Sequence, residues 1–88
     1  MTDLGLNGQP VLPLARLKPG QKGTIFAVHA DEALHRRLAA LGLRVGRAVQ
    51  VVRRARFGGP LHIRIGTTDL MVRCREAEHI EVLGVTSG

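Results

Sequence analysis

Side chains that bind divalent metals gather at two places in the sequence. Imidazole, carboxylate and thiolate groups are the usual protein ligands of transition metals. The first group opens an expected helix, where Glu32 and His35 stand three positions apart and so face the same side. The second group precedes the last expected strand. The candidate ligands are Asp31, Glu32 and His35 in the first group, and Cys74, Glu76, Glu78 and His79 in the second.

Each group has a simpler interpretation, which we favour. Acidic side chains in the first turn of a helix are stabilised by the helix dipole without any metal. Cys74 follows Leu70 and Val72 at alternate positions, and a thiol on the buried face of a strand behaves as a small hydrophobic group. We therefore expect no bound metal and no cofactor.

The sequence contains no motif typical of a catalytic centre. It has no Gly-x-Ser-x-Gly element, and no serine or threonine is convincingly paired with a base. The segment from Pro19 to Thr24 contains the residue types of a nucleotide-binding phosphate loop, but in a different order. We interpret this segment as a turn, and we expect the protein not to be an enzyme.

Strong basicity is combined with few aromatic side chains. The 88 residues include 13 basic and 7 acidic side chains, for a net charge of +6, and aromatic residues make up 2%. The basic residues have three interpretations: a solvated surface, which we favour, a surface for an acidic protein partner, or a nucleic-acid-binding surface. Single-stranded nucleic acid usually stacks on aromatic rings, and the chain offers only Phe26 and Phe57.

The segment Phe57-Gly58-Gly59-Pro60 combines a large apolar side chain with a turn. The two glycines allow the positive φ angles of a tight hairpin loop. Phe57 either folds back on the core, which we favour, or stays exposed and anchors a partner. Because the chain has no Tyr and no Trp, it lacks the aromatic groove of a domain that binds proline-rich peptides.

Hydrophobic periodicity predicts one helix and about five short strands. The helix runs from Asp31, a good N-cap, to Leu41, with leucines spaced along one face. Gly42 supplies a left-handed stop, after which Leu43 is expected to pack back on Leu38. The strands are expected over residues 24–29, 48–54, 61–65, 70–74 and 80–83.

These elements predict a mainly β fold, a small SH3-like barrel of about five strands with one α-helix between the first and second strands. A barrel hides the sheet edges that a small β domain would otherwise expose. We expect a partly ordered arm over residues 1–13, the domain over 14–83 and a frayed tail over 84–88. The chain has one cysteine, no bilayer-spanning apolar run and no secretion signal, so we expect a cytoplasmic location.

Three segments, in this order and spacing, resemble the FeoA family, the small cytoplasmic component of the bacterial ferrous iron uptake system. The first is Leu17-Lys18-Pro19-Gly20. The second is Arg37-Leu38-Ala39-Ala40-Leu41-Gly42-Leu43-Arg44-Val45-Gly46, which is similar to the family's R-L-x-x-L-G-[LM]-x-x-G element. The third is Gly59-Pro60-Leu61-His62-Ile63-Arg64-Ile65-Gly66, followed by the strand over 70–74 and Ala77-x-x-Ile80-x-Val82.

The resemblance implies an SH3-like barrel and a non-enzymatic accessory role in Fe²⁺ uptake. The implied partner is FeoB, a membrane Fe²⁺ permease whose cytoplasmic part contains a GTPase domain and would recruit the chain to the inner face of the plasma membrane. We expect a monomer or a weak homo-oligomer. FeoA-like domains also occur fused to iron-dependent repressors, but we expect no DNA-binding domain in so short a chain. The alternatives are a basic nucleic-acid-binding barrel and a small metal-sensing domain.

The helix, its exit and the hairpin are the surfaces that we expect to contact the partner. An exposed arginine such as Arg56 could also act as an arginine finger on the partner's GTPase, but nothing in the sequence distinguishes it from an arginine in a salt bridge. The expected partner-binding residues are Arg36, Arg37, Leu43, Arg44, Arg56, Phe57, Gly58 and Gly59.

Overall fold

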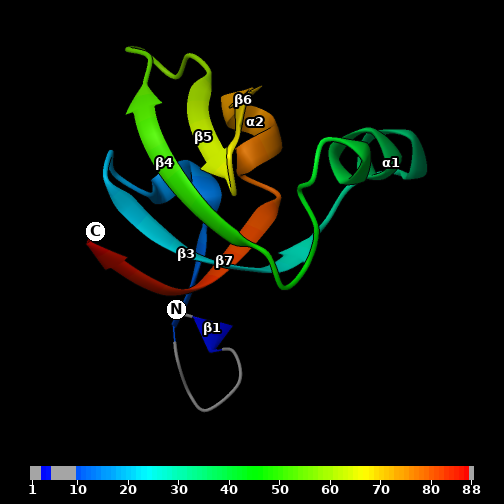
Figure 1. Cartoon of the computed structure of the whole chain (residues 1–88), viewed down its shortest axis with the longest axis horizontal. Helices are drawn as coiled ribbons and strands as arrows, with labels where there is room; N and C mark the ends of the chain where they lie inside the picture. The colour runs from blue at the N-terminus through cyan, green and yellow to red at the C-terminus, as the bar shows by residue number, and fades with distance from the viewer. Residues whose placement is uncertain (1–2, 5–9, 88) are drawn as a thin grey trace.

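The computed structural model describes residues 3–4 and 10–87, which form one antiparallel sheet that curls around a core (Figure 1). The strand order is β1-β2-β7-β3-β4-β5-β6. The strands are β1 (Asp3–Leu4), β2 (Pro10–Pro13), β3 (Gln21–Val28), β4 (Ala48–Arg54), β5 (Leu61–Ile65), β6 (Thr68–Val72) and β7 (Ile80–Ser87). The helical elements are the 3₁₀ turn η2 (Leu14–Arg16) and the helices α1 (Glu32–Ala40) and α2 (Cys74–Ala77).

The three consecutive strands β4, β5 and β6 confirm the period-two prediction. Their alternate apolar residues are buried because successive side chains of a strand point to opposite faces of the sheet. Val51 lies opposite Ile63, and Ile63 lies opposite Leu70, so the three strands stack their apolar faces in register. The buried residues of these strands are Val49, Val51, Leu61, Ile63, Ile65, Leu70 and Val72.

A β-bulge settles which face of β3 points inward. The register with β7 shifts between Ile25 and Ala27. The one extra residue in β3 changes which side chains, odd- or even-numbered, point to the core. Ile25 is buried before the bulge, and Val28 packs against the core after it. The inward face therefore changes parity along the strand, which no regular alternation in the sequence could show.

The start and stop of α1 are as predicted. The Asp31 carboxylate accepts the N–H of Leu34 at 2.8 Å and caps the helix. At the other end Gly42 takes a φ of +97°, and the N–H of Leu43 donates to the Leu38 carbonyl at 2.9 Å. These are the bonds of a Schellman stop, and they direct Leu43 into the core.

Strands extend into both the expected arm and the expected tail. Residues 10–13 of the expected arm form β2, and residues 84–87 of the expected tail continue β7. Val11 lies opposite Leu83 in β7, and Ser87 lies opposite Gln21 in β3. Pairing of this kind satisfies backbone groups that an unpaired sheet edge would expose. The expected arm's residues 1–2 and 5–9 and the last tail residue, 88, lie outside the described residues. The sheet therefore has more strands than the five expected.

The expected strand over 70–74 ends two residues early. Cys74 begins the short helix α2, so it does not occupy an inward strand position, although its side chain still packs against the core. The Glu76 carboxylate accepts the N–H of Arg73 at 3.3 Å, which favours helix over strand at this point. Ala77 is fully buried, and α2 packs against η2.

Arg54 fastens the N-terminal segment to β4. Its guanidinium donates to the carbonyl oxygen of Ala15 and, at 2.8 Å, to that of Leu17. Leu14 and Leu17 are completely buried on either side of this contact. The arginine is therefore a structural donor, and it does not belong to the solvated basic surface.

We expect Arg54→Met to lower the free energy of unfolding by about 1–3 kcal/mol, because two carbonyl groups lose their donor while the apolar stem is kept. Urea unfolding measures the change. Arg53→Met is the matched control, because Arg53 is exposed and makes no such bond, and it should change stability by less than about 0.5 kcal/mol. Equal losses in the two variants would contradict this role of Arg54.

Candidate functional site

The first candidate surface is the exposed side of α1 and its exit, here called the helix surface (Arg36, Arg37, Leu41, Arg44 and Val45). Leu41 is 45% exposed and Val45 is 62% exposed, although both are large apolar side chains. Among the described residues, these two belong to a small set of exposed large hydrophobic side chains. Leu41 is the C-cap of α1 and Val45 follows four residues later, so both belong to the chain reversal at the end of the helix.

The three arginines of the helix surface each donate a hydrogen bond within the protein. Arg36 donates to Glu32 at 3.1 Å, one turn earlier on the same helix. Arg37 donates to Glu76 of α2 at 2.7 Å, and Arg44 donates to the Ala39 carbonyl at 3.1 Å. Arg37 and Arg44 are thereby tied to other parts of the fold, whereas the Arg36–Glu32 pair is largely exposed and contributes little.

Leu43 does not belong to this surface, contrary to our expectation. It is 2% exposed, because the Schellman stop turns the chain inward after Gly42. Leu41, which was expected on the buried face of the helix, is exposed instead. The sequence contained the signal, since a residue that packs back on Leu38 cannot also be available to a partner.

The second candidate surface surrounds the β4–β5 hairpin loop and is here called the hairpin surface (Arg56, Phe57, Met71, Arg73 and Arg75). The predicted hairpin is present, but the expectation that Phe57 folds back on the core is wrong. Phe57 is 102% exposed and has a φ of +59°, followed by Gly58 at +73°. This left-handed turn directs the ring away from the sheet. Met71, which follows in β6, is 65% exposed.

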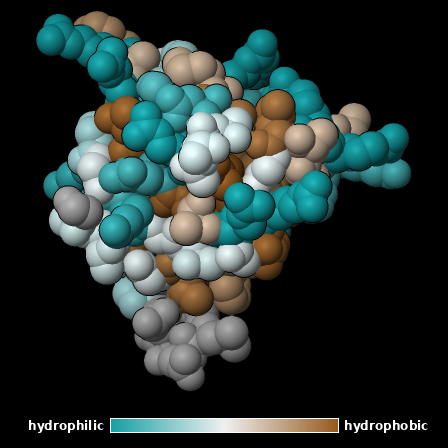
Figure 2. Space-filling model, viewed as in Figure 1, coloured by the Kyte–Doolittle hydropathy of each residue, from teal (hydrophilic) through white to brown (hydrophobic). Residues whose placement is uncertain are grey.

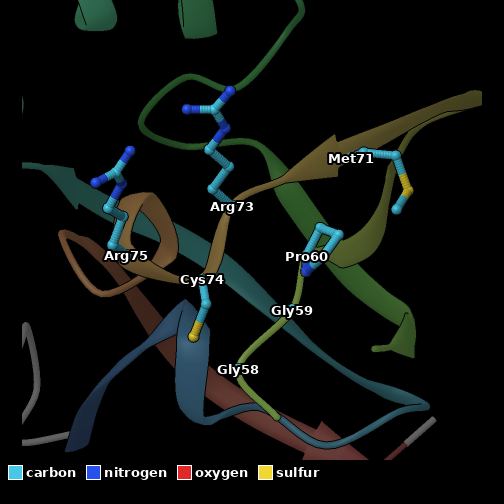
Figure 3. Close-up of a pocket in the computed structure, with 7 residues that line it drawn as sticks. All are labelled: Gly58, Gly59, Pro60, Met71, Arg73, Cys74 and Arg75. Atoms are coloured by element: carbon cyan, nitrogen blue, oxygen red, sulfur yellow. The ribbon is translucent and has the colours of Figure 1, made fainter. Parts of the chain in front are cut away.

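An open hollow lies beside the hairpin loop (Figure 3). Arg73 and Arg75 extend to one side of it, while the Cys74 thiol points the opposite way (Figure 3). The expected site residues Gly58 and Gly59 form part of its wall. The hollow has a volume of about 540 Å³ and is lined by Gly58, Gly59, Pro60, Met71, Arg73, Cys74 and Arg75.

The arginines of the hairpin surface differ from those of the helix surface in their partners. Among the side chains of residues 10–87, no carboxylate lies within 4.0 Å of the guanidinium of Arg56, Arg73 or Arg75. Arg53, exposed at the end of β4, has no such carboxylate either. The arginines of the hairpin surface are therefore not neutralised by an ion pair with residues 10–87, and two exposed apolar side chains belong to the same surface.

Asp31, Glu32 and Glu76, which were among the candidate metal ligands, have other roles in the structure. Asp31 caps α1, Glu32 pairs with Arg36, and Glu76 both pairs with Arg37 and caps α2. No three His, Cys, Asp or Glu side chains of the described residues are grouped so that they could hold a metal ion. Nor does this part of the chain contain a helix long and apolar enough to cross a membrane.

The sequence analysis missed a polar cluster on the outer face of β5 and β6. Arg64 Nε donates to Asp69 at 2.7 Å, and His62 Nε2 lies 3.3 Å from the other carboxylate oxygen. The hydrogen bond from Arg64 is the main cause that lowers the pKa of Asp69, and the same bond raises the pKa of Arg64. The tight turn at Gly66-Thr67 could have indicated the pairing, since it places Arg64 opposite Asp69.

We expect Arg64→Gln to raise the pKa of Asp69 toward the ordinary aspartate value of about 3.9. A depressed pKa in the folded state adds stability above the pKa of the unfolded chain, and this stability is lost as the pH falls through the folded value. Carboxyl ¹³C NMR titration of Asp69 measures the shift, with Arg75→Gln as the control of equal charge. An Asp69 midpoint that is the same in both variants would contradict the assignment.

Comparisons with known proteins agree with this fold. The model of the FeoA domain matches residues 12–83. An FeoA crystal structure described as an iron uptake regulatory protein is 26% identical, with a TM-score of 0.77, over 83% of this chain and 96% of that chain. The FeoA protein from Chlorobium tepidum is 34% identical, with a TM-score of 0.76, over 82% of this chain and 70% of that chain.

A third structure connects the fold to its architectural class. Stenotrophomonas maltophilia FeoA, solved in complex with zinc and described as a prokaryotic SH3 domain protein, is 31% identical. The alignment of the two structures covers 81% of this chain and 87% of that chain, with a TM-score of 0.67. A search of curated proteins found no match. From the match over residues 12–83 and the shared SH3-like fold, the chain belongs to the FeoA family.

Proposed function

We propose that the protein is a non-enzymatic accessory component of ferrous iron transport that binds the cytoplasmic, GTPase-containing part of an FeoB permease. Membership of the FeoA family supports the link to ferrous iron transport. The Stenotrophomonas maltophilia relative is described as a candidate activating factor of bacterial ferrous iron transport. A role beside a transporter needs a surface that binds another protein.

The helix surface is the single observation that carries this proposal. It combines two exposed apolar side chains, Leu41 and Val45, with Arg37 and Arg44, whose guanidinium groups are hydrogen-bonded to other parts of the fold. Ordering long side chains in advance reduces the entropy that is lost on association. Apolar residues and arginine are both common in the centre of protein interfaces.

The charge of the helix surface defines the chemistry of the partner. The guanidinium group of arginine binds carboxylates through two parallel hydrogen bonds. Arg44 donates its Nε to the Ala39 carbonyl, and its outer nitrogens make no hydrogen bond within residues 10–87, so they can bind a partner carboxylate. We therefore infer that the permease presents an acidic patch with an apolar centre to Leu41, Arg44 and Val45.

Calorimetric titration with the purified cytoplasmic region of the permease tests the proposal. We expect Leu41→Glu and Arg44→Glu each to weaken binding at least tenfold, because each places a carboxylate against an acidic surface. Lys22→Glu makes the same charge change as Arg44→Glu near the far end of β3 from α1, and it should bind like the unaltered protein.

Two results would contradict the proposal. The first is the absence of binding between the unaltered protein and the cytoplasmic region of the permease. The second is duplex DNA or RNA binding that survives at physiological ionic strength, which would favour the nucleic-acid-binding alternative. An anaerobic Fe²⁺ titration with micromolar 1:1 binding that is lost in His79→Ala would instead support the metal-sensing alternative.

A further inference from the structure

The hairpin surface differs from the helix surface in shape, in charge and in the freedom of its side chains. The loop projects from the body of the molecule, and hydrophobic and hydrophilic residues meet at its tip (Figure 2, upper left). Phe57 is 102% exposed, so its ring contacts almost nothing else in the described chain. Moving such a ring from water into an apolar environment is favourable, because its apolar area is then removed from water.

Positive charge lies next to this ring in the sequence and around the adjoining hollow. Arg56 precedes it in the loop, and Arg73 and Arg75 extend from the adjoining hollow (Figure 3). No carboxylate of residues 10–87 pairs with these guanidinium groups, in contrast to Arg36 and Arg37 of the helix surface. They are therefore suited to a surface of diffuse negative charge, which requires no fixed geometry.

We propose that the hairpin surface docks on an anionic phospholipid bilayer, with Phe57 inserted at the interface and the arginines against the lipid phosphates. Phe, like Trp and Leu, is typical of the apolar side chains that interfacial segments bury at the boundary between headgroups and acyl chains. Basic residues near an anionic membrane surface each add to the attraction. The two contributions act together because the ring and the guanidinium groups lie on one projecting loop and its neighbours.

An acidic protein is the competing occupant, and the observations favour lipid. The apolar part of the hairpin surface is centred on Phe57, which is 102% exposed, so its ring is not held by neighbouring side chains in a fixed position for a protein partner. The Arg56–Pro60 loop also contributes no Ser, Thr, Asn, Gln or Tyr side chain. Directional hydrogen bonds of that kind fix a protein partner, whereas a bilayer requires none.

Lipid binding through this surface is expected to be weak on its own. A single inserted ring and a few arginines supply less than a full lipid anchor, and stable attachment generally needs two membrane signals. Contact with a membrane-embedded permease through the helix surface would supply the second signal, because linked weak contacts raise the overall affinity. The lipid contact itself does not depend on the permease.

A tryptophan reporter tests the insertion directly. The chain contains no Trp, so Phe57→Trp places a unique fluorophore at the tip of the loop. We expect its emission to shift to the blue with vesicles of phosphatidylcholine and phosphatidylglycerol, and to stay unchanged with phosphatidylcholine alone. Added salt should reverse part of the shift, since surface charges are screened. No shift with anionic vesicles, or an equal shift with neutral ones, would overturn the proposal.

Cosedimentation with the same anionic vesicles separates the contributions of the side chains. Phe57→Asn should weaken binding about tenfold, and it should fold normally because Asn tolerates a positive φ. Arg56→Glu and Arg73→Glu should each weaken binding at least fivefold. Lys22→Glu makes the same charge change near the start of β3 and should bind more strongly than either arginine variant. Circular dichroism checks that each variant is folded.

Failure of the lipid proposal can be distinguished from failure of the proposed binding to the permease. Vesicles contain no protein partner, and Leu41→Glu should bind them as the unaltered protein does. A different result is that Phe57→Asn and Arg73→Glu bind anionic vesicles normally but no longer bind the cytoplasmic region of the permease. In that case the occupant is an acidic protein, and the lipid proposal is wrong.

Discussion

The reversal of the chain at Gly42 determines where the helix surface lies. Gly42 adopts a φ of +97°, a conformation that a side chain would strain, and Leu43 then donates its N–H to the Leu38 carbonyl. This geometry buries Leu43 beside Leu38 and leaves Leu41 and Val45 in solvent. A helix that continued through residue 42 would place a different set of side chains outward. The exposed apolar part of the helix surface is thus a consequence of how the helix ends.

The small core imposes a second constraint, on the segments that cover it. The buried residues of β4, β5 and β6 supply one apolar face, and Leu14 and Leu17 close over it from the N-terminal side. A 3₁₀ turn cannot satisfy all of its own carbonyl groups, so Arg54 donates to this segment from β4. Polar side chains are therefore needed at the edge of the core as well as on the surface.

Much of the fold could be predicted from the sequence because its signals are local. Residues 48–54 and 61–65 alternate, and the strands β4 and β5 have these bounds. Asp31 and Gly42 delimit α1 by chemistry that acts within a few residues. By contrast, β2 and the end of β7 contain Pro or Gly and little alternation. Their pairing depends on the free edges of strands that are distant in the sequence.

The candidate site was predicted less well because its determinants are not local. The pair Arg37–Glu76 joins residues that are 39 positions apart in the sequence. Arg54 contacts Leu17 and Ala15, which are 37 and 39 positions away. The exposure of Phe57 follows from a backbone angle that is unusual for a residue other than glycine. The sequence identified the loop and its glycines, but it gave no signal for the direction of the ring.

The arginines that contribute to the net charge of +6 fall into two sets, which differ in whether the guanidinium group bonds to other groups of the protein. One set is used within the protein: Arg54 fastens η2, Arg37 joins α1 to α2, and Arg64 binds Asp69 across a hairpin. Another set, around the β4–β5 loop, has no carboxylate partner within residues 10–87. Paired guanidinium groups offer a fixed pattern to a partner of fixed shape, whereas unpaired ones respond to negative charge in any arrangement. A small domain with few aromatic residues can thereby present two chemically different surfaces while using one type of side chain.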